Sequence, residues 1–298
     1  MTSTDNFTKP QLAVQYNEKN IAAIIERAGY VCIDPKVDGV RVIFDIGSDL
    51  KATIRSREGK PLASLLWLEE LDFSAVFWQP GRFDCEVTVK GMTFQKGCGR
   101  IRKAVPLPKE DLIIWPIQYT VEGGDEMPFE LRHSMAVSVA DNLNAKGFNA
   151  MGSGTDMEGF QVDNLEDLRK YYGWARGAGY EGAMVHDPQQ PVVKGKVNGW
   201  YKMKPEEDID GTITDTFEGE GQFAGMLGGF VVDVENGTTT RVGTGFTPAE
   251  RAALWRIRDT LPGRKVQLRF MELTDDGNLR LPVFDRWRDL ETSPGVKS

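Results

Sequence analysis

The chain has 298 residues, of which 40% are hydrophobic and 27% charged, and its formal net charge is −8. This balance is that of a globular protein, and no apolar run approaches the ~18–20 residues that span a bilayer, so a membrane-spanning protein is excluded. Three cysteines without a CxxC pair and only two histidines argue against a disulfide framework, structural zinc and His-rich metal catalysis. Because residues 1–10 lack a hydrophobic signal core, we expect a cytoplasmic protein, in the host cell if the chain is viral.

Basic residues are unevenly distributed along this acidic chain. Taken alone, the negative net charge argues against a nucleic-acid partner, because phosphate contacts need local positive charge. Two basic clusters occupy positions 96–103 and 194–204, however, and acidic residues concentrate at 206–210. Binding follows the local field and not the sum, so an acidic chain can still present a basic working face.

In the first two thirds of the chain, hydrophobic periodicity predicts a mixture of helices and strands. Helices are expected at 17–28, 62–71, 130–146 and 164–179. Strands are expected at 30–34, 40–46, 51–57, 82–91, 111–122, 180–187 and 199–205. The first helix places Ile21, Ile24 and Ile25 on one face, with Gly29 as its stop. Pro116 cannot donate a backbone hydrogen bond, so the strand that contains it is expected at a sheet edge or with a bulge.

After Pro205 the pattern changes to short strands. Five strand-like runs are expected at 210–217, 228–235, 238–245, 265–273 and 279–287. One helix begins after Thr247, where Pro248 and Glu250 complete a capping box. Five strands and one helix in roughly 90 residues fit an OB-type barrel. We therefore predict an α+β chain with two domains, residues 1–207 and 208–298, and a flexible join near 205–210.

The segment KVDGVR, from Lys36 to Arg41, lies between two predicted strands. Its ordinary interpretation is a β-turn with Asp-Gly at the corner. Its functional interpretation is a lysine that attacks phosphorus as a neutral amine, which requires burial or nearby cations and a rigid setting. A lysine at a strand end, with an arginine five residues later, meets those needs.

KVDGVR resembles the nucleophile motif (KxDGxR) of the covalent nucleotidyltransferases, which comprise DNA ligases, RNA ligases and mRNA-capping guanylyltransferases. Four further elements of that superfamily follow in order: Ser56–Gly59 resembles SRxG, Asp84–Glu86 resembles DGE with Cys for Gly, Glu181–Val185 resembles EGxxV, and Lys202–Lys204 resembles KxK. Five ordered matches are not expected by chance. From about residue 10 to 290, the surrounding sequence is similar to the short, two-domain DNA ligases of bacteriophages.

The resemblance implies an ATP-dependent DNA ligase with a nucleotidyltransferase (adenylation) domain of antiparallel sheets with flanking helices, followed by an OB-fold domain. It implies that Lys36 attacks the α-phosphate of ATP and that AMP then passes to the 5′-phosphate of a nick in duplex DNA. The 3′-hydroxyl finally expels AMP. Such transfers depend on positioning and charge neutralisation. We expect a monomer that uses ATP and Mg²⁺, associates with no membrane, and closes its two domains around DNA.

The resemblance also assigns roles to residues. Catalytic roles fall to Lys36, Asp38, Arg41, Lys202 and Lys204. The nucleotide is expected to contact Asp34, Lys36, Arg41, Arg57, Glu86, Trp115, Glu181, Lys202 and Lys204. As hard oxygen donors, Glu86 and Glu181 suit Mg²⁺, although Glu86 could instead hold the ribose and either could be an exposed strand carboxylate. Lys202 and Lys204 alternate with Met203, so a strand would put both on one side, and a solvated face is their alternative role.

Recognition of the adenine base leaves several alternatives open. Trp115 is the first candidate to stack on the base and Tyr119 the second, although either ring could belong to the core. Asp34, two residues before Lys36, is expected to read the adenine amino group. Pro35 has no N–H, so a contact through that donor is absent. His186 stands where the family often has lysine, and it is either a phosphate contact or a surface histidine.

Contacts to the DNA backbone are expected from basic residues: Arg57, Lys96, Arg100, Lys103, Lys194 and Lys196. In the second domain, the stretch containing Arg280, Arg286 and Arg288 is similar to the OB-domain motif that orients pyrophosphate. A basic edge strand that touches DNA is the alternative interpretation of this stretch.

Two other nucleotide-binding patterns are excluded, and two rival functions stay open. Residues 219–224 satisfy GxGxxA, but strand-like sequence follows where a dinucleotide fold needs a helix, and the chain has no GxxxxGK[ST]. Within the superfamily, an RNA ligase or a GTP-using capping enzyme is the first rival. The second is a non-catalytic DNA-binding module, which would bind DNA without forming the covalent lysine adduct.

Overall fold

The computed structural model describes residues 7–155, 160–205, 207–270, 273–274 and 276–288. The chain forms two compact units, Met1–Lys204 and Pro205–Ser298, whereas the boundary predicted from the sequence follows residue 207. Glu206 of the predicted acidic patch and residues 271–272 of a predicted strand lie outside the described residues. In the part of the chain that is described, no helix is long and apolar enough to cross a membrane.

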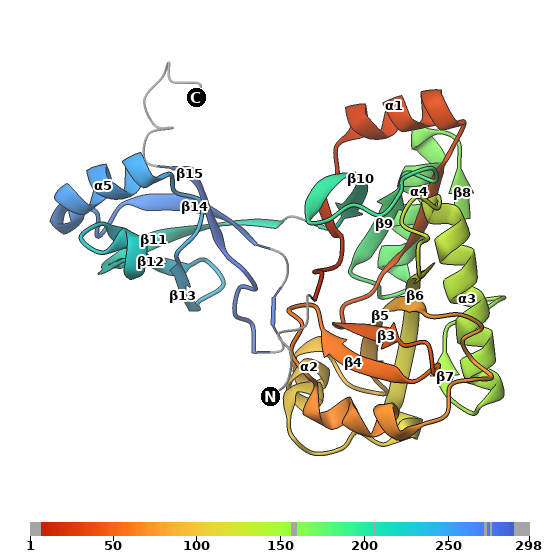
Figure 1. The fold of residues 1–298 in the computed structure, drawn as a ribbon. Helices are drawn as coiled ribbons and strands as arrows, with labels where there is room; N and C mark the ends of the chain where they lie inside the picture. Colours follow the sequence, from red (N-terminus) through yellow and green to blue (C-terminus); the bar gives the residue numbers. More distant parts are fainter. Residues whose placement is uncertain (1–6, 156–159, 206, 271–272, 275, 289–298) are drawn as a thin grey trace. The chain divides into compact units, whose positions relative to one another are not determined.

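Unit 1, the unit that ends at Lys204, contains two five-stranded sheets (Figure 1). Its strands are β1 (Leu12–Gln15), β2 (Val31–Lys36), β3 (Val40–Ile46), β4 (Ala52–Ser56), β5 (Gly81–Val89), β6 (Leu112–Val121), β7 (Asn149–Ala150), β8 (Phe160–Val162), β9 (Gly182–His186) and β10 (Lys196–Met203). The first sheet has the order β1-β10-β9-β2-β8 and the second the order β4-β3-β5-β6-β7. Pairing is antiparallel except in β1–β10 and β6–β7. The register of β5 against β6 shifts opposite Pro116, which confirms the predicted bulge.

Helices pack against these sheets. They are α1 (Glu18–Ala28), α2 (Phe94–Arg102), α3 (Phe129–Ala145) and α4 (Leu165–Gly177), with 3-10 helices η1 (Ala63–Glu70) and η2 (Lys109–Asp111). The α-helix predicted at 62–71 is wrong in type, because η1 has no side-chain N-cap and packs as tight 3-10 turns that bury Leu65 and Leu68. Helix α2 was not expected, since Gly97 and Gly99 weaken helix propensity. Burial of Gly97 and Ile101 offsets that cost.

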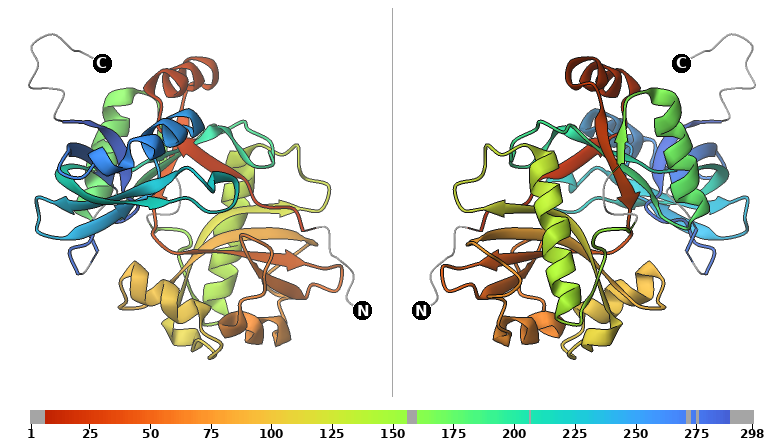
Figure 2. Two further views of the ribbon diagram at one scale, coloured as in Figure 1. Left: turned by 90° about the vertical axis from the view of Figure 1, so that its left-hand side faces the viewer. Right: turned by 90° about the vertical axis from the view of Figure 1, so that its right-hand side faces the viewer.

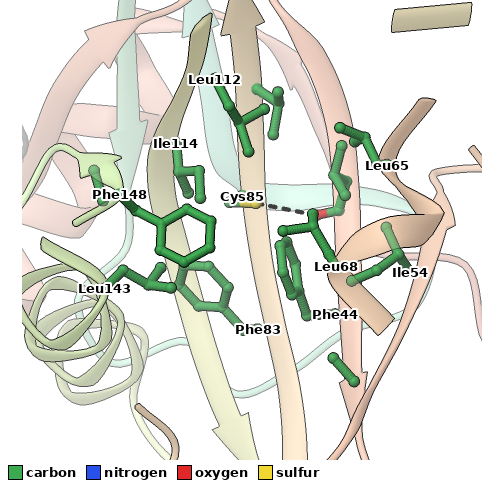
Figure 3. Close-up of a cluster of buried hydrophobic side chains, with 14 of the residues drawn as sticks. Phe44, Ile54, Leu65, Leu68, Phe83, Cys85, Leu112, Ile114, Leu143 and Phe148 are labelled. Carbon is green, nitrogen blue, oxygen red and sulfur yellow. Dashed lines mark hydrogen bonds between the residues drawn. The ribbon is translucent and has the colours of Figure 1, made fainter. Parts of the chain in front are cut away.

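Side-chain alternation along the strands of the second sheet separates a core from a polar face. In β5, Phe83, Cys85 and Val87 enter a hydrophobic core that η1 and α3 complete, so Asp84 and Glu86 lie on the opposite face. Helix α3 runs along this sheet beside β6 (Figures 1 and 2). Figure 3 shows Cys85 inside the core, where its thiol donates to a backbone carbonyl at 3.5 Å. The cysteine of the DGE-like element therefore fills core space.

The first sheet is organised in the same way. Alternate residues of β2, β9 and β10 enter a core with α1 and α4, among them Ile33, Val185 and Tyr201. The residues between them face the other way, so the polar side chains of Asp34, His186 and Lys202 share the second face of this sheet.

The described residues of unit 2 form one sheet and one α-helix. The strands are β11 (Glu207–Glu218), β12 (Leu227–Val234), β13 (Thr239–Val242), β14 (Lys265–Phe270) and β15 (Val283–Trp287), in the antiparallel order β13-β12-β11-β14-β15. Helix α5 (Pro248–Arg256) begins with the predicted capping box. The 3-10 helices are η3 (Gly221–Phe223) and η4 (Arg258–Thr260). The predicted α+β class is confirmed, and η3 followed by β12 confirms that no dinucleotide-binding helix follows the GxGxxA string.

Candidate active site

A cavity of about 950 Å³ is lined by both sheets of unit 1. Its wall includes eight of the residues singled out from the sequence: Asp34, Lys36, Arg41, Arg57, Glu86, Trp115, Lys196 and Lys202. Strand alternation brings seven of them together, because they lie on the faces of the two sheets that are turned away from the cores, whereas Arg57 lies in the turn that follows β4. The sequence elements that were matched separately therefore meet at one place.

Lys36 is the last residue of β2 and lies at the cavity wall. Its carbonyl oxygen accepts a hydrogen bond from the Glu181 amide at 3.0 Å, and its ammonium group forms an ion pair with the Glu181 carboxylate. The Lys36 side chain is 20% exposed and that of Glu181 only 5%. An exposed strand carboxylate is thus the wrong description of Glu181, which instead holds the lysine from the start of β9.

Two glycines of the matched elements allow this close approach. A Cβ atom on Gly39 would lie 2.6 Å from the Val87 carbonyl oxygen and 2.8 Å from Cγ of Glu86. A Cβ atom on Gly182 would lie 2.0 Å from the Met203 carbonyl oxygen. Both positions exclude any larger residue, so the glycines bring the lysine segment against β5 and bring β9 against the end of β10.

Arg41 is held by a buried polar network. Its guanidinium makes two 2.5 Å hydrogen bonds to Asp84, and it lies over the Trp200 ring at 5.6 Å. Gln118 donates to Asp84 at 3.4 Å and accepts from Arg132 at 3.0 Å. Burial alone would lower the pKa of Arg41, but the Asp84 carboxylate outweighs it and raises that pKa. The network therefore presents a fixed, charged arginine to the cavity.

Glu86 and Lys202 have perturbed acidities. Burial raises the pKa of Glu86 to about 7, although the cations of Arg41 and Lys36 oppose the shift. Burial lowers the pKa of Lys202, and the positive charges of Lys36 and Lys196 add to the effect. A fully solvated face is therefore the wrong description of Lys202. Strand β10 ends at Met203, so Lys204 lies just beyond the strand and does not continue its alternation.

Asp34 occupies the buried end of the polar face, between two imidazoles. Nε2 of His133 and Nε2 of His186 each lie 3.4 Å from one of its carboxylate oxygens. Burial would raise the pKa of Asp34, but the two imidazoles outweigh it and bring that pKa below its usual value. His186 is only 3% exposed, so the prediction of a surface histidine is wrong.

The two aromatic candidates for base stacking lie in different surroundings. Trp115 lines the cavity, and its indole N–H donates to the Thr88 hydroxyl at 2.8 Å. Tyr119 is fully buried in the core against Phe77, and its hydroxyl donates to the Gln79 carbonyl. Tyr119 as a base-stacking residue is therefore wrong, because β-strand alternation turns it into the core.

The predicted DNA contacts are dispersed over unit 1. Arg57 and Lys196 line the main cavity, whereas Lys194 lines a second cavity of about 550 Å³. Lys96 and Arg100 lie on α2 and Lys103 follows it. In unit 2, Arg288 forms an ion pair with Asp210 at 2.8 Å, while Arg286 is about half-exposed.

Known DNA ligases resemble this chain in sequence. The family model described as "DNA ligase OB-like domain" matches residues 218–288. The DNA ligase of Enterobacteria phage T3 is 27% identical, with 97% of this chain and 98% of the relative covered. The DNA ligase of Escherichia phage T7 is 26% identical with the same coverage. Over nearly its whole length, the chain is thus similar to the short, phage-type ATP-dependent DNA ligases.

Solved structures of DNA ligases are similar to this chain as well. The structure of the ATP-dependent DNA ligase from bacteriophage T7 in complex with ATP matches with a TM-score of 0.61 and 25% identity, covering 94% of this chain and 98% of that one. A Lig E DNA ligase matches with a TM-score of 0.71 over 95% of this chain, and its 24% identity supports the fold alone.

Several residues of the site were not predicted from the sequence. Asp84, the first residue of the DGE-like element, was quoted but given no role, although it holds Arg41. Gln118, Arg132 and His133 belong to no matched element. A buried arginine or histidine on a helix face is a weak signal, because only the packing of α3 against β6 reveals its partners.

Proposed function

We propose that the chain seals nicks in double-stranded DNA and that Lys36 is the residue that becomes adenylylated. Nζ of Lys36 attacks the α-phosphate of ATP, so that a phosphorus–nitrogen bond forms and pyrophosphate leaves. The AMP then passes to the 5′-phosphate of the nick and Lys36 is released. Attack of the 3′-hydroxyl on the activated phosphate finally forms the phosphodiester bond and expels AMP.

One observation supports this proposal most directly. Lys36 lies at the wall of a cavity that also contains Arg41, Arg57 and Lys202. Charged donors that line one cavity favour a group with several phosphates, and transfer between phosphates depends chiefly on positioning and charge stabilisation. Lys204, just beyond the end of β10, is proposed to assist them.

Attack by Lys36 requires its neutral amine. The Glu181 carboxylate contacts the ammonium group, so it is the acceptor placed to take the proton. The contact must then open before Nζ can approach phosphorus. Asp38, between Lys36 and Arg41, is proposed to act in the same step.

Mg²⁺ is the second component of the proposal. Glu86 and Glu181 supply oxygen donors, which fit this ion, and Glu86 alternatively holds the ribose. The described residues contain no group of three or more His, Cys, Asp or Glu that could hold a metal by themselves. Water and phosphate oxygens would therefore complete its shell, as Mg²⁺ prefers. When bound, the ion supplies neutralisation of phosphate charge.

The remaining assignments concern the base and the DNA. Asp34 is proposed to read the adenine amino group and Trp115 to stack on the base. Proposed contacts to the DNA backbone are Arg57, Lys96, Arg100, Lys103, Lys194 and Lys196. The chain is proposed to act as a monomer in the cytoplasm.

A nick-sealing assay tests the proposal. Wild-type protein with ATP and Mg²⁺ should seal a duplex nick that carries a 5′-phosphate, but not one with a 5′-hydroxyl, and should not join single-stranded RNA. Lys36→Ala should abolish sealing, whereas Lys19→Ala, at an exposed position of α1, should not. Activity with GTP alone would indicate a capping enzyme, joining of RNA alone an RNA ligase, and DNA binding without any sealing a non-catalytic module. Each of these outcomes would contradict the proposal.

A further inference from the structure

The N-terminal segment, residues 7–9, packs against the turn that carries Arg57. This turn, Ser56–Gly59, is the SRxG-like element and begins at the last residue of β4. Gly59 has a φ of 79°, which favours glycine, and a Cβ atom there would lie 2.6 Å from Cδ1 of Phe7. The Phe7 ring and the backbone of the turn are therefore packed closely, and a larger residue at position 59 would push them apart.

Two arginines hold the Phe7 ring in place. Cζ of Arg55, on β4, lies 5.8 Å from the ring centre, and Cζ of Arg82, on β5, lies 5.1 Å from it. Asp45, on the intervening strand β3, pairs with both cations, at 3.8 Å from Arg55 and 2.8 Å from Arg82. Arg82 also donates to the Thr8 carbonyl oxygen at 2.6 Å. Because the two arginines are partly buried, these cation–π contacts are stronger than exposed ones and anchor the segment on the sheet.

A second contact joins the N-terminal segment to the turn through charge. Nζ of Lys9 lies 2.5 Å from the Glu58 carboxylate, which also lies 3.3 Å from Nε of Arg57. The Lys9 and Glu58 side chains are 65% and 47% exposed, so solvent screens this ion pair and it adds little stability. The contact of Phe7 is therefore the main support that the N-terminal segment gives to the turn.

Arg57 is an accessible cation of the main cavity. Its side chain is 55% exposed, whereas that of Arg41, in the same cavity wall, is 15% exposed and paired with Asp84. The phosphate backbone of a duplex can reach an exposed guanidinium but not a buried, paired one. Phe7 is not among the described residues that line this cavity, so it supports the turn from outside and leaves Arg57 accessible.

We propose that Phe7 is a positioning residue for DNA, which holds the Ser56–Gly59 turn so that the Arg57 guanidinium meets a phosphate of the nicked duplex. The inference rests on the proposed function, in which Arg57 contacts the DNA backbone, and it goes further by assigning the placement of this arginine to the N-terminal segment.

The physical basis of this role is conformational entropy. An arginine on a loose turn loses more freedom when it binds a phosphate than one whose backbone is already held, so support of the turn lowers the cost of the contact. Phe7 lies outside the cavity that contains Lys36, so transfer of AMP to this lysine should not depend on it. A selective effect on DNA binding is therefore expected.

Equilibrium binding of the full chain to a labelled nicked duplex, without ATP, tests the inference. Arg57→Ala should weaken binding roughly ten- to a hundredfold, the cost of one charge-assisted hydrogen bond. Phe7→Ala should weaken it about two- to tenfold, because the guanidinium is present but no longer held. Each change should reduce the slope of log K against log salt concentration by up to about 0.9, the value for one lost phosphate contact. Phe7→Tyr, which keeps the ring, and Trp174→Ala, which removes a half-exposed ring from α4, should bind like wild type.

A double variant separates positioning of Arg57 from general support of the fold. In the Arg57→Ala background, Phe7→Ala should change binding by less than about twofold, because the residue that it positions is gone. Phe7→Ala alone should adenylylate its lysine within about twofold of the wild-type rate. If Phe7→Ala fails to fold, Phe7→Leu, which keeps apolar bulk but has no ring, should show the same pattern.

Three results would overturn the inference: wild-type DNA binding by Phe7→Ala, an equal loss without Arg57, or adenylylation that slows as much as binding weakens. Its failure is distinct from failure of the proposed function. Normal nick sealing together with unchanged binding by Phe7→Ala would overturn the inference alone. The expected binding differences without any adduct on Lys36 would contradict the proposed function alone.

Discussion

Replacement of Glu86 by glutamine should make unit 1 more stable and the enzyme less active. Glu86 lies on β5, paired with Arg41 on β3 and with Trp115 on β6. Burial raises its pKa from an ordinary value of 4.5 to about 7 in the folded chain. Between these two pH values, Glu86 is therefore protonated in the folded state and ionised in the unfolded state.

The sign and size of the effect follow from this difference. Because the folded state binds more protons, the free energy of unfolding falls as pH rises through this window and levels off above the folded pKa. A shift of roughly 2.5 pKa units corresponds to at most about 3 kcal/mol, and partial exposure of Glu86 reduces the expectation to about 1–3 kcal/mol. Glu86→Gln cannot ionise, so it should escape this loss.

Urea denaturation of wild type and Glu86→Gln at about pH 5 and about pH 8 measures the effect. The variant should be more stable by the stated amount at the higher pH and nearly equal to wild type at the lower one. Single-turnover adenylylation should meanwhile fall by about a hundredfold, since a charged ligand of the ion or ribose is lost. Glu110→Gln, an exposed glutamate at the start of the same sheet region, is the matched control. A stability difference that does not change with pH would refute the reasoning.

Three further substitutions probe the buried structure around the site. Arg132→Met should lower the free energy of unfolding by about 2–4 kcal/mol in urea, because Gln118 and buried carbonyls lose their donor; a neutral effect would contradict the network. Arg41→Lys keeps the charge but loses the two-bond contact with Asp84, so the rate of adenylylation should fall about tenfold to a hundredfold with little change in melting temperature. Cys85→Gly should destabilise the core by about 1–3 kcal/mol and leave the KM for ATP unchanged, and a raised KM would show that the thiol affects the site.

Much of the fold could be read from the sequence because most strands show alternating or continuous apolar patterns and several helices have clear ends. The capping box after Thr247 and the stop at Gly29 both appear as predicted. Helix α2 could not be read, since its glycines favour a loop and only burial against β5 and η1 makes it helical. The 3-10 character of residues 63–70 likewise depends on how Leu65 and Leu68 meet the core.

The parts of the site that lie within short sequence motifs were predictable. The parts that join residues far apart along the chain were not. KVDGVR and EGAMV each contain their own spacing signal, and the pairing of β2 with β9 then joins Lys36 to Glu181. The arginine network and the histidine pair instead join β5, β6, α3 and β9, which are far apart along the chain. The position of His186 in the sequence left a phosphate contact and a surface histidine open, whereas the sheet turns this side chain inward.

Location of the covalent adduct tests the central claim most directly. Wild-type protein is incubated with ATP and Mg²⁺, its intact mass is measured, and the modified peptide is sequenced by tandem mass spectrometry. The account predicts one added AMP, acid-labile and attached to Lys36, and no adduct in Lys36→Arg. An adenylate on any other residue, or an adduct that persists in the variant, would contradict it.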